Sequence, residues 1–168
     1  YADFDLDKAI APDEFIKRLN DQLPKGLRLV DAKQKKTKTN IMASVARASY
    51  DVLISCAKDT SLDELRTHIE HFMKRQEIIV EKKVKKGNKD IDIRPMIHKI
   101  DVSSANVAVG ECSANENLFR ISMLLSAGSK SNLKPELMLT ALSDMAEKRI
   151  KIKRIHRTGL LVEKEGKI

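Results

Sequence analysis

Apolar positions near the start of the chain follow two different periods. Residues 1–6 alternate between apolar and polar side chains, which predicts a strand. Residues 12–23 repeat apolar side chains at helical spacing, behind a proline and two acids that suit the first turn of a helix. The sequence Pro24-Lys25-Gly26 ends this helix, and residues 27–32 predict a second strand. The first segment therefore predicts a strand–helix–strand unit.

The rest of the chain predicts a longer series of elements. Residues 33–40 are basic, polar and aperiodic, which predicts a linker, and residues 41–48 predict a short helix. The predicted strands that follow span residues 49–56, 77–84, 91–102, 106–112, 117–126 and 149–162. The predicted helices span residues 61–75, which open with a capping-box pattern, and residues 132–146. Pro95 predicts an edge or a bulge in the strand that contains it.

This order of elements predicts an α+β protein made of two ferredoxin-like (split β-α-β) units, the first of them incomplete. Residues 1–34 are expected to form the C-terminal part of the first unit, residues 35–47 a linker or short helix, and residues 48–168 the second unit. A single mixed sheet that spans both units is the alternative. The chain opens on a strand-like pattern without a methionine, so we interpret it as a fragment that lacks its natural N-terminus.

Composition adds a strong positive charge to this picture. The formal net charge is +8, and residues 148–157 hold six Lys or Arg and no acid. Such patches attract polyphosphates, nucleic acid or anionic membranes, although a soluble basic protein with no nucleic-acid role is the alternative. No apolar run is long enough to span a membrane. Cys56 and Cys112 predict buried free thiols, so we expect a cytoplasmic protein.

A lysine-rich turn is the first candidate for anion binding. Gly87-Asn88 predicts a hairpin turn between two strand-like runs, and Lys86 and Lys89 flank it. Period-two spacing places Arg94 on one strand face with two aspartates. They form either a salt-bridged row or a bidentate anion clamp built on Arg94. A charged hairpin that only keeps a sheet edge soluble is the alternative.

A second candidate follows the strand that ends at residue 126. Gly128 predicts a tight turn, and Lys130, Asn132 and Lys134 lie where a helix is expected to begin. Unpaired N–H groups and the positive end of the helix dipole favour an anion at such a place. The segment is no Walker motif, because Ser129 precedes the lysine where that motif has glycine. A helix start with solvated lysines is the alternative.

The third candidate is the basic final strand, which contains Arg154 and Arg157. A strand with basic groups on an open sheet face can track a phosphate backbone. Base stacking requires aromatic side chains, and Tyr50, Phe72 and Phe119 are too few and too dispersed to compose a platform. Any contact with RNA is therefore expected to be mainly with its backbone.

The sequence predicts no metal site and no complete catalytic site. His68 and His71 are three residues apart on a predicted helix, but no HExxH pattern surrounds them. No spacing suggests a Ser/His/Asp or Cys/His arrangement, or a paired-carboxylate site. The catalytic residues are therefore unknown, and we do not expect enzymatic activity from this chain alone.

Several motifs, taken in order and spacing, resemble the radical SAM-linked (radical SAM-associated) family of uncharacterised bacterial proteins. The matching motifs are Asp13-Glu14-Phe15 with Arg18-Leu19-Asn20, Leu23-Pro24-Lys25-Gly26-Leu27, Ile41-Met42-Ala43 with Ala48-Ser49-Tyr50, Lys86-Gly87, Asp92-Ile93-Arg94-Pro95, Gly128-Ser129-Lys130 with Asn132-Leu133-Lys134-Pro135-Glu136, and Arg157-Thr158-Gly159-Leu160. Members of this family are usually longer at the N-terminus, with a segment rich in His, Arg and Pro that this chain lacks. They are encoded beside, or fused to, a radical SAM protein, often near ribosomal-protein and ribonuclease genes.

The resemblance implies a partner role in RNA-related or ribosome-related chemistry. The radical SAM cluster pattern CxxxCxxC is absent, so the partner is expected to carry S-adenosylmethionine and a 4Fe-4S cluster, and this chain no cofactor. We therefore expect an accessory, non-catalytic domain that binds an anionic substrate such as RNA for a radical SAM protein. The expected contacts are Lys86, Lys89, Arg94, Lys130, Asn132, Lys134, Arg154 and Arg157. The alternatives are an RNA-modifying enzyme completed by a missing N-terminal segment, and a protein–protein docking module.

Overall fold

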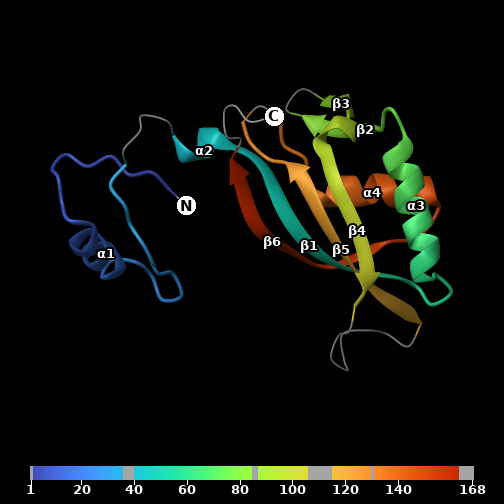
Figure 1. Cartoon of the computed structure of the whole chain (residues 1–168), viewed down its shortest axis with the longest axis horizontal. Coiled ribbons are helices and arrows are strands. Elements are labelled where there is room, and N and C mark those ends of the chain that lie inside the picture. The colour runs from blue at the N-terminus through green and yellow to red at the C-terminus, as the bar shows by residue number, and fades with distance from the viewer. Residues whose placement is uncertain (1, 36–39, 85–86, 106–114, 130, 163–168) are drawn as a thin grey trace. The chain divides into compact units, whose positions relative to one another are not determined.

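A computed structural model describes residues 2–35, 40–84, 87–105, 115–129 and 131–162 (Figure 1). The chain divides into two compact units, Tyr1–Ala43 and Ser44–Ile168. The predicted boundaries, after residue 34 and after residue 47, fall on either side of this division. Each unit is described by itself.

The first unit contains helix α1 (Pro12–Asn20), which begins with a proline and two acids as its sequence predicts. None of the described residues 2–35 belongs to a strand, so the strands predicted for residues 1–6 and 27–32 are wrong. A strand needs a neighbouring strand as its hydrogen-bond partner. In the segment at residues 27–32, the backbone of Leu29 instead bonds to the side chain of Asn20. The Leu29 N–H donates to Asn20 Oδ1 over 2.7 Å, and the Leu29 carbonyl accepts from Asn20 Nδ2 over 3.1 Å.

The second unit holds nearly all of the regular structure. A short helix at the division between the units, α2 (Ile41–Ser44), leads into β1 (Val45–Ala57), so this strand begins earlier than predicted. The elements that follow are α3 (Leu62–Lys74), β2 (Ile79–Val84), β3 (Gly87–Asp92), the 3-10 turn η1 (Arg94–Met96), β4 (Ile97–Ser104), β5 (Glu116–Ser126), α4 (Pro135–Ala146) and β6 (Lys151–Val162). The strand predicted for residues 106–112, and Cys112 with it, lies outside the described residues.

The strands form a four-stranded antiparallel sheet in the order β4-β5-β1-β6, and a separate ribbon, β2-β3. The segment with α3 and the ribbon connects β1 to β4, and β5 lies between those two strands. Helix α4 connects β5 to β6, and β1 lies between them. The predicted α+β class is therefore confirmed, as a mixed fold with this sheet at its centre.

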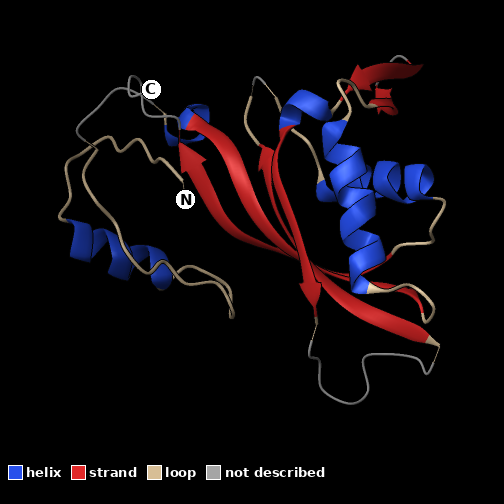
Figure 2. Cartoon of the chain, turned by 45° about the vertical axis from the view of Figure 1, so that its right-hand side comes forward, coloured by secondary structure: helices blue, strands red, loops and turns tan. Residues whose placement is uncertain are grey.

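Helices α3 and α4 cover one face of the sheet (Figures 1 and 2). Buried residues of the central strands, such as Val52 and Ile121, pack in one cluster with Phe72 of α3 and Leu139 of α4. The opposite face carries no helix of this unit, and polar side chains such as Ser122 are exposed there. The sheet therefore has one face covered by the two helices and one face that carries no helix of this unit.

Candidate functional site

The structure distributes the predicted anion-binding residues over separate elements. Lys89 lies on the ribbon strand β3, Lys134 directly precedes α4, and both are exposed. Arg154 and Arg157 are exposed on β6, at one edge of the four-stranded sheet. The remaining residues are Asn132, which is exposed before α4, and Lys86 and Lys130, which lie outside the described residues. These positions do not define one lysine-rich pocket.

The Arg94 guanidinium group connects the end of α3 to the start of β4, so we do not assign it to an anion clamp. Its Nε and Nη2 donate to the Met73 carbonyl over 3.1 and 2.8 Å, and its Nη1 donates to the Ile97 carbonyl over 3.2 Å. The Met73 carbonyl lies in the last turn of α3, where a cation satisfies unpaired acceptors. The predicted salt-bridged row is not formed either, because Asp92 Oδ1 accepts from the backbone N–H groups of Ile78 and Arg94.

Gly128 is explained by packing against the start of β1. A side chain at this position would place its Cβ inside van der Waals contact of the Val45 carbonyl oxygen. The neighbouring Ala127 N–H donates to the Ala46 carbonyl over 2.8 Å, which fixes the loop to the same strand. Helix α4 begins only at Pro135, later than predicted, and Lys134 makes no side-chain cap. The loop is thus shaped by its close approach to β1.

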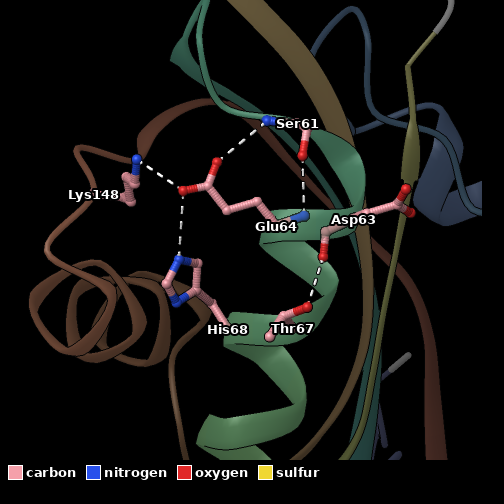
Figure 3. Close-up of polar contacts among 6 residues, drawn as sticks. All are labelled: Ser61, Asp63, Glu64, Thr67, His68 and Lys148. Atoms are coloured by element: carbon pink, nitrogen blue, oxygen red, sulfur yellow. Dashed lines mark hydrogen bonds and ion pairs between the residues drawn. The ribbon is translucent and has the colours of Figure 1, made fainter.

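Part of the basic run at residues 148–157 is neutralised by Glu64 of α3. Glu64 caps the N-terminus of its own helix. Its carboxylate accepts from the Ser61 N–H, and the Ser61 hydroxyl accepts from the Glu64 N–H, which together form the predicted capping box. The same carboxylate lies 2.9 Å from Lys148 Nζ and 3.8 Å from His68 Nε2 (Figure 3). The Lys148 hydrogen bond lowers the pKa of Glu64 and raises the pKa of Lys148.

Two more lysines of this run bind a single carboxylate. Glu116, the first residue of β5, forms ion pairs with Lys151 and with Lys153, the latter over 3.0 Å. These hydrogen bonds, with a smaller contribution from Ser55, lower the pKa of Glu116 to about 2. The carboxylate is almost fully shielded from solvent, so it stays ionised through its lysine partners. Lys148, Lys151 and Lys153 are therefore all engaged within the fold.

The arginines of β6 remain available for a ligand. Arg154 and Arg157 make no ion pair and no side-chain hydrogen bond with any other described residue. Arg120 of β5 is likewise exposed and unpaired among the residues that the structure describes. Leu53 of β1 is the cross-strand partner of both Arg120 and Arg154, so the two arginines share one row on the exposed face. Three unpaired guanidinium groups thus lie on the two strands that flank β1.

Sequence reasoning missed Arg120, although a signal was present. In the predicted strand at residues 117–126, Arg120 falls between Phe119 and Ile121, and period-two alternation places it on the opposite face from them. Phe119 and Ile121 are buried, whereas Arg120 is exposed. The sequence therefore indicates that Arg120 lies on the polar face of this strand, but it does not indicate that Arg120 lies beside Arg154.

Acidic groups limit the positive charge of the exposed face. In the next row, Asp51 of β1 accepts a hydrogen bond from the Ser122 hydroxyl over 2.7 Å. Asp101 of β4 pairs with Lys99 over 2.9 Å. The unpaired positive charge of this face therefore includes Arg120 and Arg154, and it does not cover the whole sheet.

The exposed face offers no aromatic platform among the described residues. Phe72 and Phe119 are buried in the core, and Tyr50 packs against the same core from β1. Stacking of unpaired bases requires an aromatic ring on the accessible surface. The expectation that a nucleic acid would be held by its phosphates is thus consistent with where these rings lie.

The described residues form no metal cluster. No group of three or more His, Cys, Asp or Glu side chains gathers in a geometry suited to a metal ion in the described part of the chain. His68 lies against Glu64, and the His98 ring lies 3.0 Å from the Ser126 hydroxyl, so these two histidines are held at different places. Cys56 is buried, and burial raises the pKa of its thiol to about 11, which makes it a poor nucleophile.

A cleft of about 510 Å³ opens between α4 and the ribbon strand β2. Its wall is mixed in polarity: Phe72, Ile79 and Met145 are among the apolar lining residues, and the charged ones are Arg75, Glu81 and Asp144. None of the predicted anion-binding residues lines it. The cleft is therefore distinct from the arginine row.

The fold and this surface define an α+β domain with an exposed, arginine-bearing sheet face. Residues 1–135 match the family described as "Uncharacterized protein conserved in bacteria (DUF2344)", and this match covers most of the chain, so the protein belongs to that family. No curated protein and no solved structure matches the chain. Within the described residues, no helix is both long and apolar enough to cross a membrane.

Proposed function

We propose that the protein is an accessory domain that binds an anionic substrate, with RNA as the favoured class, on the exposed face of its four-stranded sheet. The observation that carries the proposal is the row in which the unpaired Arg120 and Arg154 flank Leu53. Arginine presents a planar fork of donors to phosphate and stays charged at every physiological pH. Two such groups on a rigid sheet suit a phosphate backbone better than flexible lysines on loops do.

The proposed contacts fall into a primary and a secondary set. Arg120 and Arg154 are the primary contacts, because neither is engaged within the described fold. Arg157 is also unpaired among the described residues, but its register partner Tyr50 packs against the core, so Arg157 belongs to the other face and joins the secondary set. Lys86, Lys89, Lys130, Asn132 and Lys134 remain as a secondary set that could extend the path of a longer ligand. Arg94 leaves the assignment, since its guanidinium group is bound to backbone carbonyls.

We further propose that the second unit is ferredoxin-like, with the β2-β3 ribbon inserted between its first helix and second strand. The strand order β4-β5-β1-β6 and the two helices on one face support this assignment. In such a unit the helix-free face is the larger accessible surface, so the fold and the site proposals point to the same place. The proposed unit starts near residue 48 or slightly earlier, at the beginning of β1.

The proposed partner is a radical SAM protein that supplies S-adenosylmethionine and a 4Fe-4S cluster. The support is the sequence resemblance together with the positive charge, and the chain itself would contribute substrate binding. The expected result is that the chain copurifies with a radical SAM protein encoded beside its gene. Failure to copurify under low salt would contradict the partnership while leaving the anion site to be judged by its own test.

Binding of the full chain to bulk tRNA, followed by fluorescence anisotropy across a salt series, tests the RNA proposal. We expect saturable binding at low salt that weakens steeply as salt is added, because phosphate contacts release counterions. Inorganic pyrophosphate as a competitor separates a site for small polyphosphates from a site for a nucleic-acid backbone. Absence of tRNA binding at low salt would overturn the RNA assignment.

A further inference from the structure

Strand β6 is an open edge of the four-stranded sheet. It pairs with β1, and no other strand in the described part of the chain lies on its outer side (Figure 2). The strand is 12 residues long and most of its side chains are exposed. An open edge presents backbone N–H and C=O groups that can hydrogen-bond with another extended chain. The outer side of β6 is therefore suited to accept one more strand.

The charge of β6 restricts which chain can pair with it. The strand contains four Lys or Arg and no acid between Lys151 and Val162. Glu116 pairs with two of these lysines and offsets one of their two charges, while Arg154 and Arg157 have no acidic partner among the described residues. Like charges opposite each other destabilise a strand pair, so a second copy of β6 is a poor partner. An acidic segment would instead be attracted.

The positions of the two arginines define the partner further. Arg154 is the register partner of Leu53, and Arg157 is the register partner of Tyr50. Leu53 and Tyr50 are three residues apart on β1, so the arginines belong to opposite faces of the sheet. A matching segment therefore carries acids on both of its faces. Ile152, Leu161 and Val162, exposed by 37%, 42% and 52%, add apolar contacts at the two ends of the strand.

The other edge of the sheet is less suited to this role. Strand β4 is only eight residues long, and its Lys99 is already paired with its own Asp101. It therefore lacks both the length and the uncompensated charge of β6. Strand β6 is therefore the better edge for binding another strand.

We propose that β6 is a docking edge for an extended acidic segment of a protein partner, which adds as a fifth strand beside Arg154 and Arg157. Backbone hydrogen bonds supply most of the contact in this mode, and the side chains select the partner. The inference goes beyond the proposed function, because it needs a protein segment and no nucleic acid. It also leaves Arg120 outside the docking contact, so the two proposals can fail separately.

The test uses the full chain and a short peptide of repeating glutamate–glutamate–valine–valine. The control peptide has the same sequence with every backbone amide N-methylated, which keeps the charge and removes the donors from both edges of the strand. We expect the first peptide to bind and to slow amide hydrogen exchange in β6 but not in β4. We expect the methylated peptide to bind at least about tenfold more weakly, because it cannot complete the backbone ladder.

Charge reversal tests the arginines. The double substitution Arg154→Glu with Arg157→Glu should weaken the first peptide about tenfold or more. Lys74→Glu with Lys134→Glu makes the same change in charge at exposed positions away from β6 and should have a much smaller effect. Equal binding of the two peptides, unchanged exchange in β6, or equal losses in the two double variants would each overturn the proposal. Absence of peptide binding would overturn it too.

Discussion

Arg120 of β5 and Arg154 of β6 lie on either side of Leu53 in one cross-strand row of the exposed sheet face. Neighbouring strands are about 4.8 Å apart, so the two backbone positions are separated by about 10 Å. Leu53 is only 7% exposed, although it belongs to the face without helices. The row therefore combines two charged groups at its flanks with a shielded apolar centre, a geometry in which both guanidinium groups can approach one phosphate-bearing ligand.

Arg94→Ala is expected to destabilise the protein by about 2–3 kcal/mol, because it removes charge-assisted hydrogen bonds to the carbonyls of Met73 and Ile97. Urea unfolding followed by circular dichroism measures the change. Arg66→Ala serves as the matched control, since its ion pair with Asp63 is exposed and should contribute less than about 1 kcal/mol. Similar losses in the two variants would contradict a structural role for Arg94.

Gly128→Ala is expected to lower the free energy of unfolding by about 1–3 kcal/mol, since the new methyl group meets the backbone carbonyl of Val45. A backbone atom of a paired strand cannot move aside as a side chain can. Gly159→Ala is the control, because its methyl group would meet the Ser49 hydroxyl at 3.0 Å, and that side chain can rotate. The same denaturation experiment compares them, and a loss for Gly159→Ala as large as for Gly128→Ala would refute the explanation.

The lowered pKa of Glu116 predicts that the protein loses stability in acid. Its pKa is lowered from 4.5 to about 2 in the folded protein, so the unfolded chain takes up the proton first as pH falls. The stabilisation is fully present above pH 4.5 and is lost as pH falls through about 2. Glu116→Gln should therefore flatten the acid limb of the stability curve, and Glu64, whose pKa is also lowered, should account for part of the remaining slope.

Urea unfolding between neutral and acidic pH checks this prediction. The exposed Glu136→Gln provides the control, because Glu136 has no ion pair among the described residues. An acid limb that is as steep in Glu116→Gln as in the parent protein would show that the lysine contacts do not act on Glu116 as described.

Cys56 is expected to resist thiol reagents in the folded protein. Burial raises the pKa of its thiol from 9.0 to about 11, so at neutral pH the thiolate fraction is about a hundredfold smaller than in an unfolded chain. Stability contributed by the protonated thiol is present below pH 9.0 and is lost as pH rises through about 11. Alkylation rates of a Cys112→Ser variant, with and without urea, measure the protection. Equal rates would contradict burial of Cys56.

The sequence predicted elements whose pattern is local. Residues 117–126 alternate clearly and form β5, and the capping-box pattern before α3 is formed by Ser61 and Glu64. The predicted strand at residues 27–32 alternates less clearly and, lacking a hydrogen-bonded neighbour, does not form. A period of two shows that a segment can be a strand, but a strand also requires a partner, and the partner is chosen by the whole fold.

The candidate site was less predictable for the same reason. Lysine-rich turns stand out in a sequence, whereas the meeting of Arg120 and Arg154 depends on both strands pairing with β1. Neutralisation of Lys148 by Glu64 joins residues far apart in the chain. Sequence charge therefore overstated the free positive charge at residues 148–157, and only the tertiary ion pairs reveal which groups remain available.

The most direct test compares the salt dependence of tRNA binding in two double variants of equal charge. Arg120→Gln with Arg154→Gln removes the row on the sheet face, and Lys58→Gln with Lys74→Gln removes exposed charges that are not assigned to the site. We predict that the first variant binds more weakly and that the magnitude of its slope of log K against log salt falls by about one per lost contact, about two in total. The second variant should keep nearly the parent slope. An unchanged slope in the sheet-face variant, or equal losses in both, would contradict an anion site on the exposed sheet face.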